Sequence, residues 1–322
     1  MAFTPLEAKT HYSREAPASQ KQPGRFARKK KGNAIGYLFL LPWLVGLFVF
    51  TAGPVIASLY LSFTNYNLLG APEWIGLQNF QEMFHDPQWW DAVRVTVVYV
   101  VLSVPLKLAA ALVVALLLKR GLVALGLFRA IYYVPSLLGS SVAIALLWRQ
   151  LFDSDGLVNS ALGLIGIHAT TSWVSTPDTA LYTLVILSVW QFGTPMLIFL
   201  AGLQQIPQEY YEAASTDGAG PLRNFFSITL PLITPLVFFN LILQMVGAFQ
   251  AFTPSYIVSG GTGGPVDSTL FYTLYLYQEG FGYLKMGYAS AMAWVLLIAI
   301  AVFTALAFLS SRYWVFYQDE RS

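Results

Sequence analysis

This sequence contains no cysteine and few charges. The absence of cysteine excludes disulfide bonds and thiolate chemistry. Charged residues make up 11% of the 322 positions, whereas about 25% is usual in a soluble domain. No G-x-x-x-x-G-K-S/T phosphate loop occurs, so the chain alone cannot use ATP in the P-loop manner. There is no clustered nucleophile and base, and the three histidines lack metal-ligand spacing, so we predict no catalytic residue and no metal site.

Apolar residues dominate the composition instead. They form 56% of the chain, and the mean hydropathy is +0.59. A helix needs about 20 apolar residues to cross the hydrocarbon core, and six segments meet that need. No alternating ten-residue pattern indicates a barrel. We therefore predict an all-α, polytopic membrane protein with six transmembrane helices, at 35–63, 92–118, 128–152, 179–203, 231–255 and 288–311.

Several of these predicted spans contain a proline. A proline frees backbone carbonyls, which in a membrane must be satisfied by neighbouring helices rather than left facing lipid. We therefore predict kinks that face protein, at Pro42, Pro54, Pro105, Pro135, Pro195 and Pro235.

Basic residues predict the orientation, because Lys and Arg are retained on the cytoplasmic side. With the N-terminus inside, 14 of the 18 Lys and Arg lie in cytoplasmic segments, and both termini are cytoplasmic. Residues 1–33 hold eight basic against two acidic residues, which predicts a disordered cytoplasmic tail drawn to anionic membrane lipid. Residues 34–322 are predicted to form the six-span domain.

A short polar loop, at about 204–230, joins the fourth and fifth predicted spans. Pro207 and Glu209 predict the start of a helix, since proline tolerates the first turn and a carboxylate suits the positive end of the helix dipole. Gly218 is suited to end it. Pro221 and Pro231 are expected to keep this helix from running on into the next span. In the predicted orientation the loop is cytoplasmic.

The same loop carries a spaced motif: E-A-A, three residues, G, nine residues and I-x-L-P. Seven fixed positions within 20 residues make the match specific, against the alternative of an ordinary amphipathic connector. They are Glu212, Ala213, Ala214, Gly218, Ile228, Leu230 and Pro231. The motif resembles the EAA motif of bacterial ABC-importer permeases.

Beyond the motif, residues 33–312 resemble the carbohydrate-type importer permeases of the maltose and glycerol-3-phosphate class. The resembling pieces are Leu41-Pro42, Gly53-Pro54, Ile75-Gly76-Leu77-Gln78-Asn79-Phe80, Tyr133-Val134-Pro135 and Met286-Gly287-Tyr288-Ala289-Ser290-Ala291. The loop at 153–178 departs from some maltose-type permeases, because it has no room for the large extra domain that they carry. The sequence of this loop therefore does not predict which segment binds the solute-binding protein.

The resemblance implies the type I ABC importer permease architecture in a bacterial inner membrane. It implies coupling to an ATPase through Glu212, Ala213, Ala214, Asp217 and Gly218. The implied partners are a second homologous permease, two copies of a cytoplasmic ABC ATPase and an external, periplasmic solute-binding protein. ATP and Mg would be used by the ATPase, so no cofactor is expected in this chain, and no nucleic-acid partner is expected either.

Polar residues inside the predicted spans are candidates for a substrate pathway, because polar groups in hydrocarbon are costly. In the fifth span Asn240, Gln244, Gly247 and Ala251 recur at helical spacing, and aromatic residues lie nearby. Amides and aromatic rings suit sugars, but helix packing through amide hydrogen bonds explains the same pattern. A second polar, helix-weakening site runs from Gln191 to Pro195. We predict a pathway lined by Gln191, Asn240, Gln244, Gln250 and Tyr256.

Lys107 is the one charge deep within a predicted span, two residues after Pro105. It either bonds carbonyls freed by the proline or attracts an anionic substrate. No Asp or Glu lies at a span centre to carry protons. This weakens the alternative function, a stand-alone secondary carrier or channel for a small polar solute driven by a gradient.

The glycine run at 260–264 is expected to be a flexible external loop. By the family resemblance, this loop and the segment 267–282 face the solute-binding protein. Aromatic residues of the segment are expected at the membrane interface, namely Phe271, Tyr272, Tyr275 and Tyr277.

Overall fold

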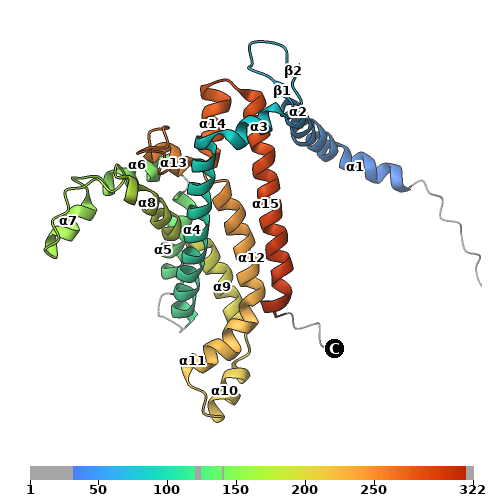
Figure 1. Cartoon of the computed structure of the whole chain (residues 1–322). Helices are drawn as coiled ribbons and strands as arrows, with labels where there is room; N and C mark the ends of the chain where they lie inside the picture. Colours follow the sequence, from blue (N-terminus) through green and yellow to red (C-terminus); the bar gives the residue numbers. More distant parts are fainter. Residues whose placement is uncertain (1–31, 120–124, 140, 317–322) are drawn as a thin grey trace, which may run out of the picture. The chain divides into compact units, whose positions relative to one another are not determined.

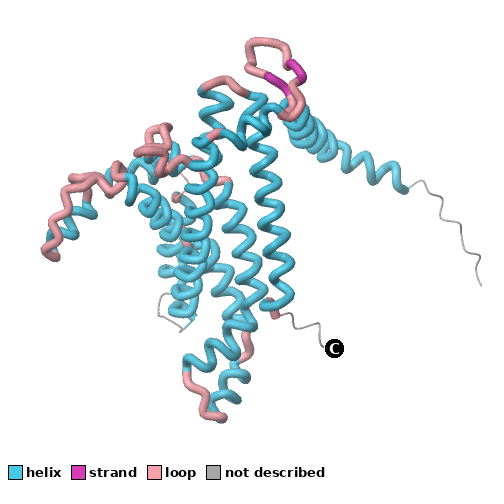
Figure 2. The backbone as a smooth tube through the Cα atoms, in the orientation of Figure 1, coloured by secondary structure: helices cyan, strands magenta, loops and turns pink. Residues whose placement is uncertain are grey.

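A computed structural model describes residues 32–119, 125–139 and 141–316. Helices make up most of this part of the chain, and its two strands form one short antiparallel pair, β1 (Thr64–Asn65) with β2 (Glu73–Trp74) (Figure 2). The predicted all-α, polytopic fold class is confirmed. Most of the predicted tail, residues 1–31, lies outside the described residues.

The chain divides into two compact units, residues 1–54 and 55–322. The described part of the first unit consists of α1 (Gly32–Leu47), the π-helical turn η1 (Phe48–Ala52) and the first two residues of α2 (Gly53–Leu61), which follows η1 along the chain. The apolar run from Phe39 to Leu61 is long enough to cross a membrane, in agreement with the first predicted span.

The second unit is built around one long helix, α4 (Pro87–Lys119). It packs against α8 (Pro177–Trp190), α9 (Gly193–Gln205) and α12 (Leu230–Phe249), and α12 packs in turn against α15 (Met286–Trp314) (Figure 1). Ala111 and Ala115 of α4 are fully buried. Such small side chains let helix backbones approach closely, which is how membrane helices pack.

Four helical stretches of the described chain are long and apolar enough to cross a membrane. Two bent pairs raise this to six when each pair counts as one span: α5 (Leu125–Leu138) with α6 (Val142–Leu151), and α8 with α9. The third and fourth predicted spans are therefore found at the expected places, and the fourth is broken at the helix-weakening site that was predicted from Gln191 to Pro195.

The break between α8 and α9, which bends by 41°, has a local cause in Pro195. Proline lacks an N–H, so the Gln191 carbonyl loses its helical donor. Ser136 Oγ of α5 donates to that carbonyl at 2.9 Å, and the Thr194 N–H donates to the same Ser136 Oγ at 3.0 Å. Gly193 permits this approach, since a Cβ there would lie 2.5 Å from the Tyr132 carbonyl oxygen. A neighbouring helix thus satisfies the kink, as predicted.

The fifth span begins earlier than predicted. α11 (Pro221–Asn224), the π-helical turn η2 (Phe225–Thr229) and α12 follow one another without a gap, so Pro231 does not stop the helix. Pro231 lies in the first turn of α12, where the missing N–H is tolerated. Just before it, the Leu230 N–H donates to the Phe225 carbonyl in the wider π-helical turn. Only Pro221 acts as expected, because it begins a new helix.

Short helices occupy the two ends of the second unit. At one end, called the α14 end, lie α3 (Gln78–His85), α14 (Tyr272–Tyr277) and the π-helical turn η3 (Gln278–Gly282). At the opposite end, called the α10 end, lie α10 (Gln208–Thr216) and α11 (Figure 1). The remaining short helices are α7 (Leu157–Leu164) and α13 (Thr253–Val258).

The glycine run at 260–264 is a hydrogen-bonded turn, so the prediction of a flexible loop is wrong. The Thr269 N–H donates to the Gly263 carbonyl at 3.0 Å, and Gln278 Nε2 donates to the Gly261 carbonyl at 2.8 Å. Gly263 has a φ of +79°, and a Cβ there would lie 2.5 Å from the Leu270 side chain. Glycine is needed here for a close turn rather than for mobility.

The aromatic residues after this turn also differ from expectation. Phe271, Tyr272 and Tyr275 are buried inside the second unit rather than placed at a membrane interface, and Tyr277 is the most exposed of the four. Tyr272 and Tyr275 bury large apolar areas while their hydroxyls find partners, which is typical of buried tyrosines.

Candidate functional site

The predicted polar helix exists as α10, within a segment that we call the α10 segment, residues 207–219. Pro207 is the residue before the first helical residue, and Glu209 lies in the first turn. A carboxylate at this position is stabilised by the positive end of the helix dipole. The boundaries predicted from these two residues and from Gly218 are confirmed.

Gly218 ends α10 through a Schellman motif. The Ala219 N–H donates to the Ala214 carbonyl at 2.9 Å, and the Gly218 N–H donates to the Ser215 carbonyl at 3.1 Å. This pattern requires the left-handed region at the residue after the cap, and Gly218 has a φ of +77°. No atom lies within 4 Å of where its Cβ would be, so backbone conformation rather than space demands glycine here.

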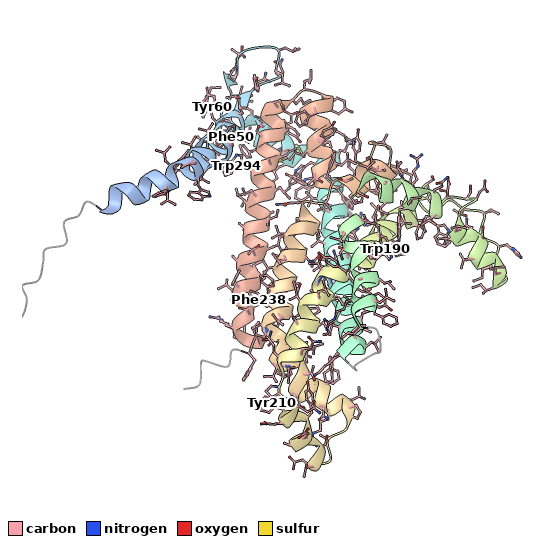
Figure 3. The ribbon with its side chains drawn as sticks, turned by 180° about the vertical axis from the view of Figure 1, so that it is seen from behind. Phe50, Tyr60, Trp190, Tyr210, Phe238 and Trp294 are labelled. Atoms are coloured by element: carbon pink, nitrogen blue, oxygen red, sulfur yellow. The ribbon has the colours of Figure 1, made fainter. Side chains whose placement is uncertain are left out.

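The side chains of the predicted coupling set point mainly to solvent. Glu212, Ala213, Asp217 and Gly218 are exposed, whereas Ala214 is half-buried. Figure 3 shows Tyr210 of α10, itself 45% exposed, at the α10 end of the bundle. A helix of this kind, exposed and carrying a carboxylate and small residues, has a surface free to contact another protein.

One tyrosine fastens α10 to the membrane helices. Tyr211 Oη accepts a hydrogen bond from Lys119 Nζ at 3.1 Å and lies 2.9 Å from Thr229 Oγ1. Lys119 Nζ also lies 4.3 Å from the centre of the Tyr211 ring, within the range of a cation–π contact. Lys119 is the last residue of α4, and Thr229 directly precedes α12. We call these three residues the Tyr211 clasp, and it links α10 to two membrane helices.

A polar cavity lies among the membrane helices of the second unit. Its volume is about 330 Å³, and residues of α4, α8 and α12 line it together with the residues that follow α12. Gln191, Gln244 and Gln250 from the predicted pathway reach it, and so does Lys107. Gly247 and Ala251 of the predicted small-residue face also line it. Three amides, one at the end of α8 and two at the end of α12, therefore share one cavity.

Two predicted pathway residues do not line this cavity. Asn240 is fully buried, and its Nδ2 donates to the Leu236 carbonyl of its own helix at 2.9 Å. Tyr256 packs in an aromatic cluster with Phe252 and Tyr277. The ring centre of Phe252 lies 5.2 Å from those of Tyr256 and Tyr277, and the centres of the two tyrosine rings are 5.7 Å apart. Asn240 is thus placed as expected for a residue that packs between helices rather than one that contacts a solute.

Tyr99 and Ser188 line the cavity without having been predicted. Tyr99 lies on the buried face of α4, and its ring centre is 4.5 Å from that of Phe271. Nothing in the local sequence marks either residue, because their roles depend on which helices become neighbours. The helix order, rather than any motif, places them in the cavity.

The α14 end is held by hydrogen bonds between residues far apart in sequence. Asp86, next to the start of α4, accepts hydrogen bonds from the hydroxyls of Tyr275 and Tyr288, the latter at 3.0 Å. Tyr272 Oη accepts from Trp89 Nε1 at 3.2 Å and donates to the Met292 carbonyl at 2.8 Å. Burial raises the pKa of Tyr275, and the hydrogen bond to Asp86 raises it further, so this hydroxyl stays a donor.

Comparison with known proteins places the chain in a family. Residues 84–316 match the model of the family described as binding-protein-dependent transport system inner membrane component. The chain is 50% identical over 292 residues to the probable ABC transporter permease protein YesP of Bacillus subtilis (strain 168), covering 90% of this chain and 94% of that protein. It is 32% identical to the lactose transport system permease protein LacF of Rhizobium radiobacter, covering 89% and 97%.

A solved structure has the same fold. It is that of a bacterial alginate ABC transporter in complex with an alginate pentasaccharide-bound periplasmic protein, and one of its chains is 22% identical to this one. The TM-score is 0.71, with 87% of this chain and 94% of that chain covered. The chain therefore belongs to the family of binding-protein-dependent transport system inner membrane components and is a multi-pass permease of the ABC importer class.

Proposed function

We propose that this protein is the permease subunit of an ABC importer that brings a sugar, an oligosaccharide or a related polyol into a bacterial cell. It pairs with a second homologous permease, so that two sets of membrane helices enclose the pathway. Two copies of a cytoplasmic ATPase drive transport, and an external solute-binding protein delivers the solute. The chain itself is not an enzyme, and ATP and Mg are used by the ATPase.

The observation that carries this proposal is the α10 segment. An exposed helix with a carboxylate, closed by a glycine in the left-handed region and fastened by the Tyr211 clasp, is a docking element on a fixed base. A carrier driven by a gradient needs no such element. The coupling set, Glu212, Ala213, Ala214, Asp217 and Gly218, is the surface on which the ATPase acts.

The carbohydrate substrate is supported by the cavity and by a relative. Neutral amides supply both donors and acceptors to hydroxyl groups without the desolvation cost of a charge, and three glutamines line the cavity. The aromatic side chains of Tyr99 and Phe252 line it as well, and apolar sugar faces suit such rings. The lactose permease LacF, which aligns along nearly its whole length, is named for a sugar.

The α10 end is placed on the cytoplasmic side. Of the 18 Lys and Arg in the sequence, 14 then lie in cytoplasmic segments, which is the bias that orients membrane proteins. The termini lie on the same side, and the α14 end faces the solute-binding protein outside. The absence of cysteine makes this easy to test, because any introduced cysteine is the unique label.

Reconstitution into proteoliposomes tests the proposal. The chain, its partner permease and the ATPase are assembled with the solute-binding protein, and uptake of labelled saccharides is measured with and without ATP. The proposal predicts uptake only with ATP, the ATPase and the binding protein together. Uptake by this chain under an ion gradient, with no ATPase present, would instead establish the secondary carrier.

Two leucine variants test the pathway inside the bundle. Gln244→Leu removes an amide that lines the cavity, so we expect uptake to fall at matched complex abundance while assembly and basal ATPase activity persist. Asn240→Leu alters a fully buried packing position, so we expect assembly to suffer instead. Unchanged uptake in the Gln244 variant would remove this residue from the pathway.

A further inference from the structure

The polar cavity contains one cation and no carboxylate. Among the described residues that line it, Lys107 alone carries a charge. Lys107 lies 12 residues before Lys119, the last residue of α4, which is roughly 18 Å along the helix axis at 1.5 Å per residue. This depth places its side chain within the hydrocarbon core rather than at either surface.

Among the described residues, Lys107 has no protein partner. In the described part of the chain, the salt bridge joins Lys285 to Glu279 at the α14 end, and Lys107 Nζ donates no hydrogen bond to a protein atom. A lysine at membrane depth is costly and normally pairs with a carboxylate, a carbonyl or a water-filled cavity. Of these three environments, the cavity is the one that surrounds the Lys107 ammonium group.

The proline two residues earlier does not explain the lysine. Pro105 lacks an N–H and frees the Val101 carbonyl four residues before it. Lys107 lies six residues after Val101, about 240° around the helix, so its stem leaves the helix on another face. The hydrogen bond that would make Lys107 a structural partner of this carbonyl is not formed among the described residues.

The remaining lining suits a solute that is both polar and negatively charged. Gln191, Gln244 and Gln250 offer neutral donors and acceptors, and Tyr99 and Phe252 offer ring surface. A single ammonium group among neutral groups makes the cavity net positive. In a low-dielectric site such a charge strongly favours an anion over a neutral solute of the same size.

We propose that the solute carried through this cavity bears an acidic group, a carboxylate or a phosphate on a saccharide or polyol, and that Lys107 Nζ pairs with that group. The inference rests on the proposed import of carbohydrate and specifies its substrate class. The cavity volume, about 330 Å³, is at the lower end of ligand pockets, which span about 300–1,000 Å³, so it holds a short part of the solute at a time.

A competition assay tests this directly. Vesicles containing the complete importer are energised with ATP in the presence of the binding protein and an equimolar mixture of three labelled probes: a neutral hexose disaccharide, the corresponding uronate disaccharide and a hexose phosphate. Mass spectrometry measures the imported ratio within each sample, so protein abundance cancels. The uronate and phosphate arms separate the two sources of negative charge.

We expect wild-type protein to import at least one acidic probe in excess over the neutral one. Lys107→Met should lower the ratio of acidic to neutral import by about 10- to 100-fold, the loss expected for a hydrogen bond to a charged group. Lys107→Arg keeps the charge and should retain most of the preference. As a matched control, Gln244→Leu should lower import of acidic and neutral probes alike.

Two results would overturn the inference. One is a wild-type importer that takes up the neutral probe in excess, which leaves carbohydrate import intact but rejects the acidic substrate class. The other is an unchanged acidic-to-neutral ratio in Lys107→Met. Loss of all ATP-dependent saccharide uptake in wild-type protein is a distinct result, because it rejects the proposed import itself.

Discussion

The two ends of the second unit are built in different ways. At the α14 end, buried side chains join α4, α14 and α15 through hydrogen bonds between residues up to 202 positions apart. At the α10 end, most residues of the coupling set are exposed, and the Tyr211 clasp fastens the segment. The α14 end is thus held by internal contacts, whereas the α10 segment leaves most of its surface open for the partner contact that we propose.

The largest expected effect is on the scaffold. Asp86→Ala removes the acceptor shared by two buried tyrosine hydroxyls, at a cost of about 1–3 kcal/mol for each hydroxyl left unpaired. We expect the thermal midpoint of the purified complex to fall by several degrees. Asp91→Ala, at an exposed position one turn along α4, is the matched control and should leave the midpoint unchanged. Equal midpoints for the two variants would mean that Asp86 does not hold this end.

The next effect concerns the end of α10. Gly218→Val forces a β-branched residue into the left-handed region, at a cost of about 1–3 kcal/mol or more, so α10 should lose its defined end. We expect uptake to fall about tenfold or more while membrane insertion persists. Gly220→Val is a good control, since Gly220 has an extended backbone and open space around it. Normal uptake and normal binding-protein-stimulated ATPase activity in Gly218→Val would show that the geometry of this turn is not needed.

A smaller effect is expected from the clasp. Tyr211→Phe removes the hydroxyl that joins Lys119 to Thr229 but keeps the ring, and a typical hydrogen bond contributes about 0.5–1.5 kcal/mol. We expect uptake per ATP hydrolysed to fall about 2- to 10-fold, because α10 would transmit movement to α4 and α12 less tightly. The neighbouring Tyr210→Phe should have no effect. A loss of the same size in both variants would point to a general surface effect rather than to the clasp.

The sequence predicted the parts of this arrangement that depend on local chemistry. Apolar run length located all six spans, and Pro207 with Gly218 located α10, because helix boundaries follow from backbone preferences of single residues. The weak point between Gln191 and Pro195 was also visible, since proline removes an N–H that no other residue in the segment replaces.

The sequence did not reveal contacts between distant residues. Tyr211 meets Lys119 across 92 positions, and Ser136 meets Gln191 across 55, and neither pair has a local pattern. The effect of Pro231 was predicted wrongly, because a π-helical turn in front of it accommodates the proline. Helical spacing and polarity predicted both Asn240 and Gln244 as pathway residues. Only the packing of the helices shows that Asn240 is buried whereas Gln244 lines the cavity.

Site-specific cross-linking tests the central claim, that the α10 segment is the docking surface for the ATPase, most directly. A single cysteine replaces the exposed Asp217 in one variant and the exposed Thr262, beyond α13, in another, since the chain has no cysteine of its own. During turnover of the complete importer, the account predicts that Asp217→Cys captures the ATPase and Thr262→Cys does not. Capture of the ATPase from Thr262→Cys, or its failure from Asp217→Cys in an active complex, would contradict the account.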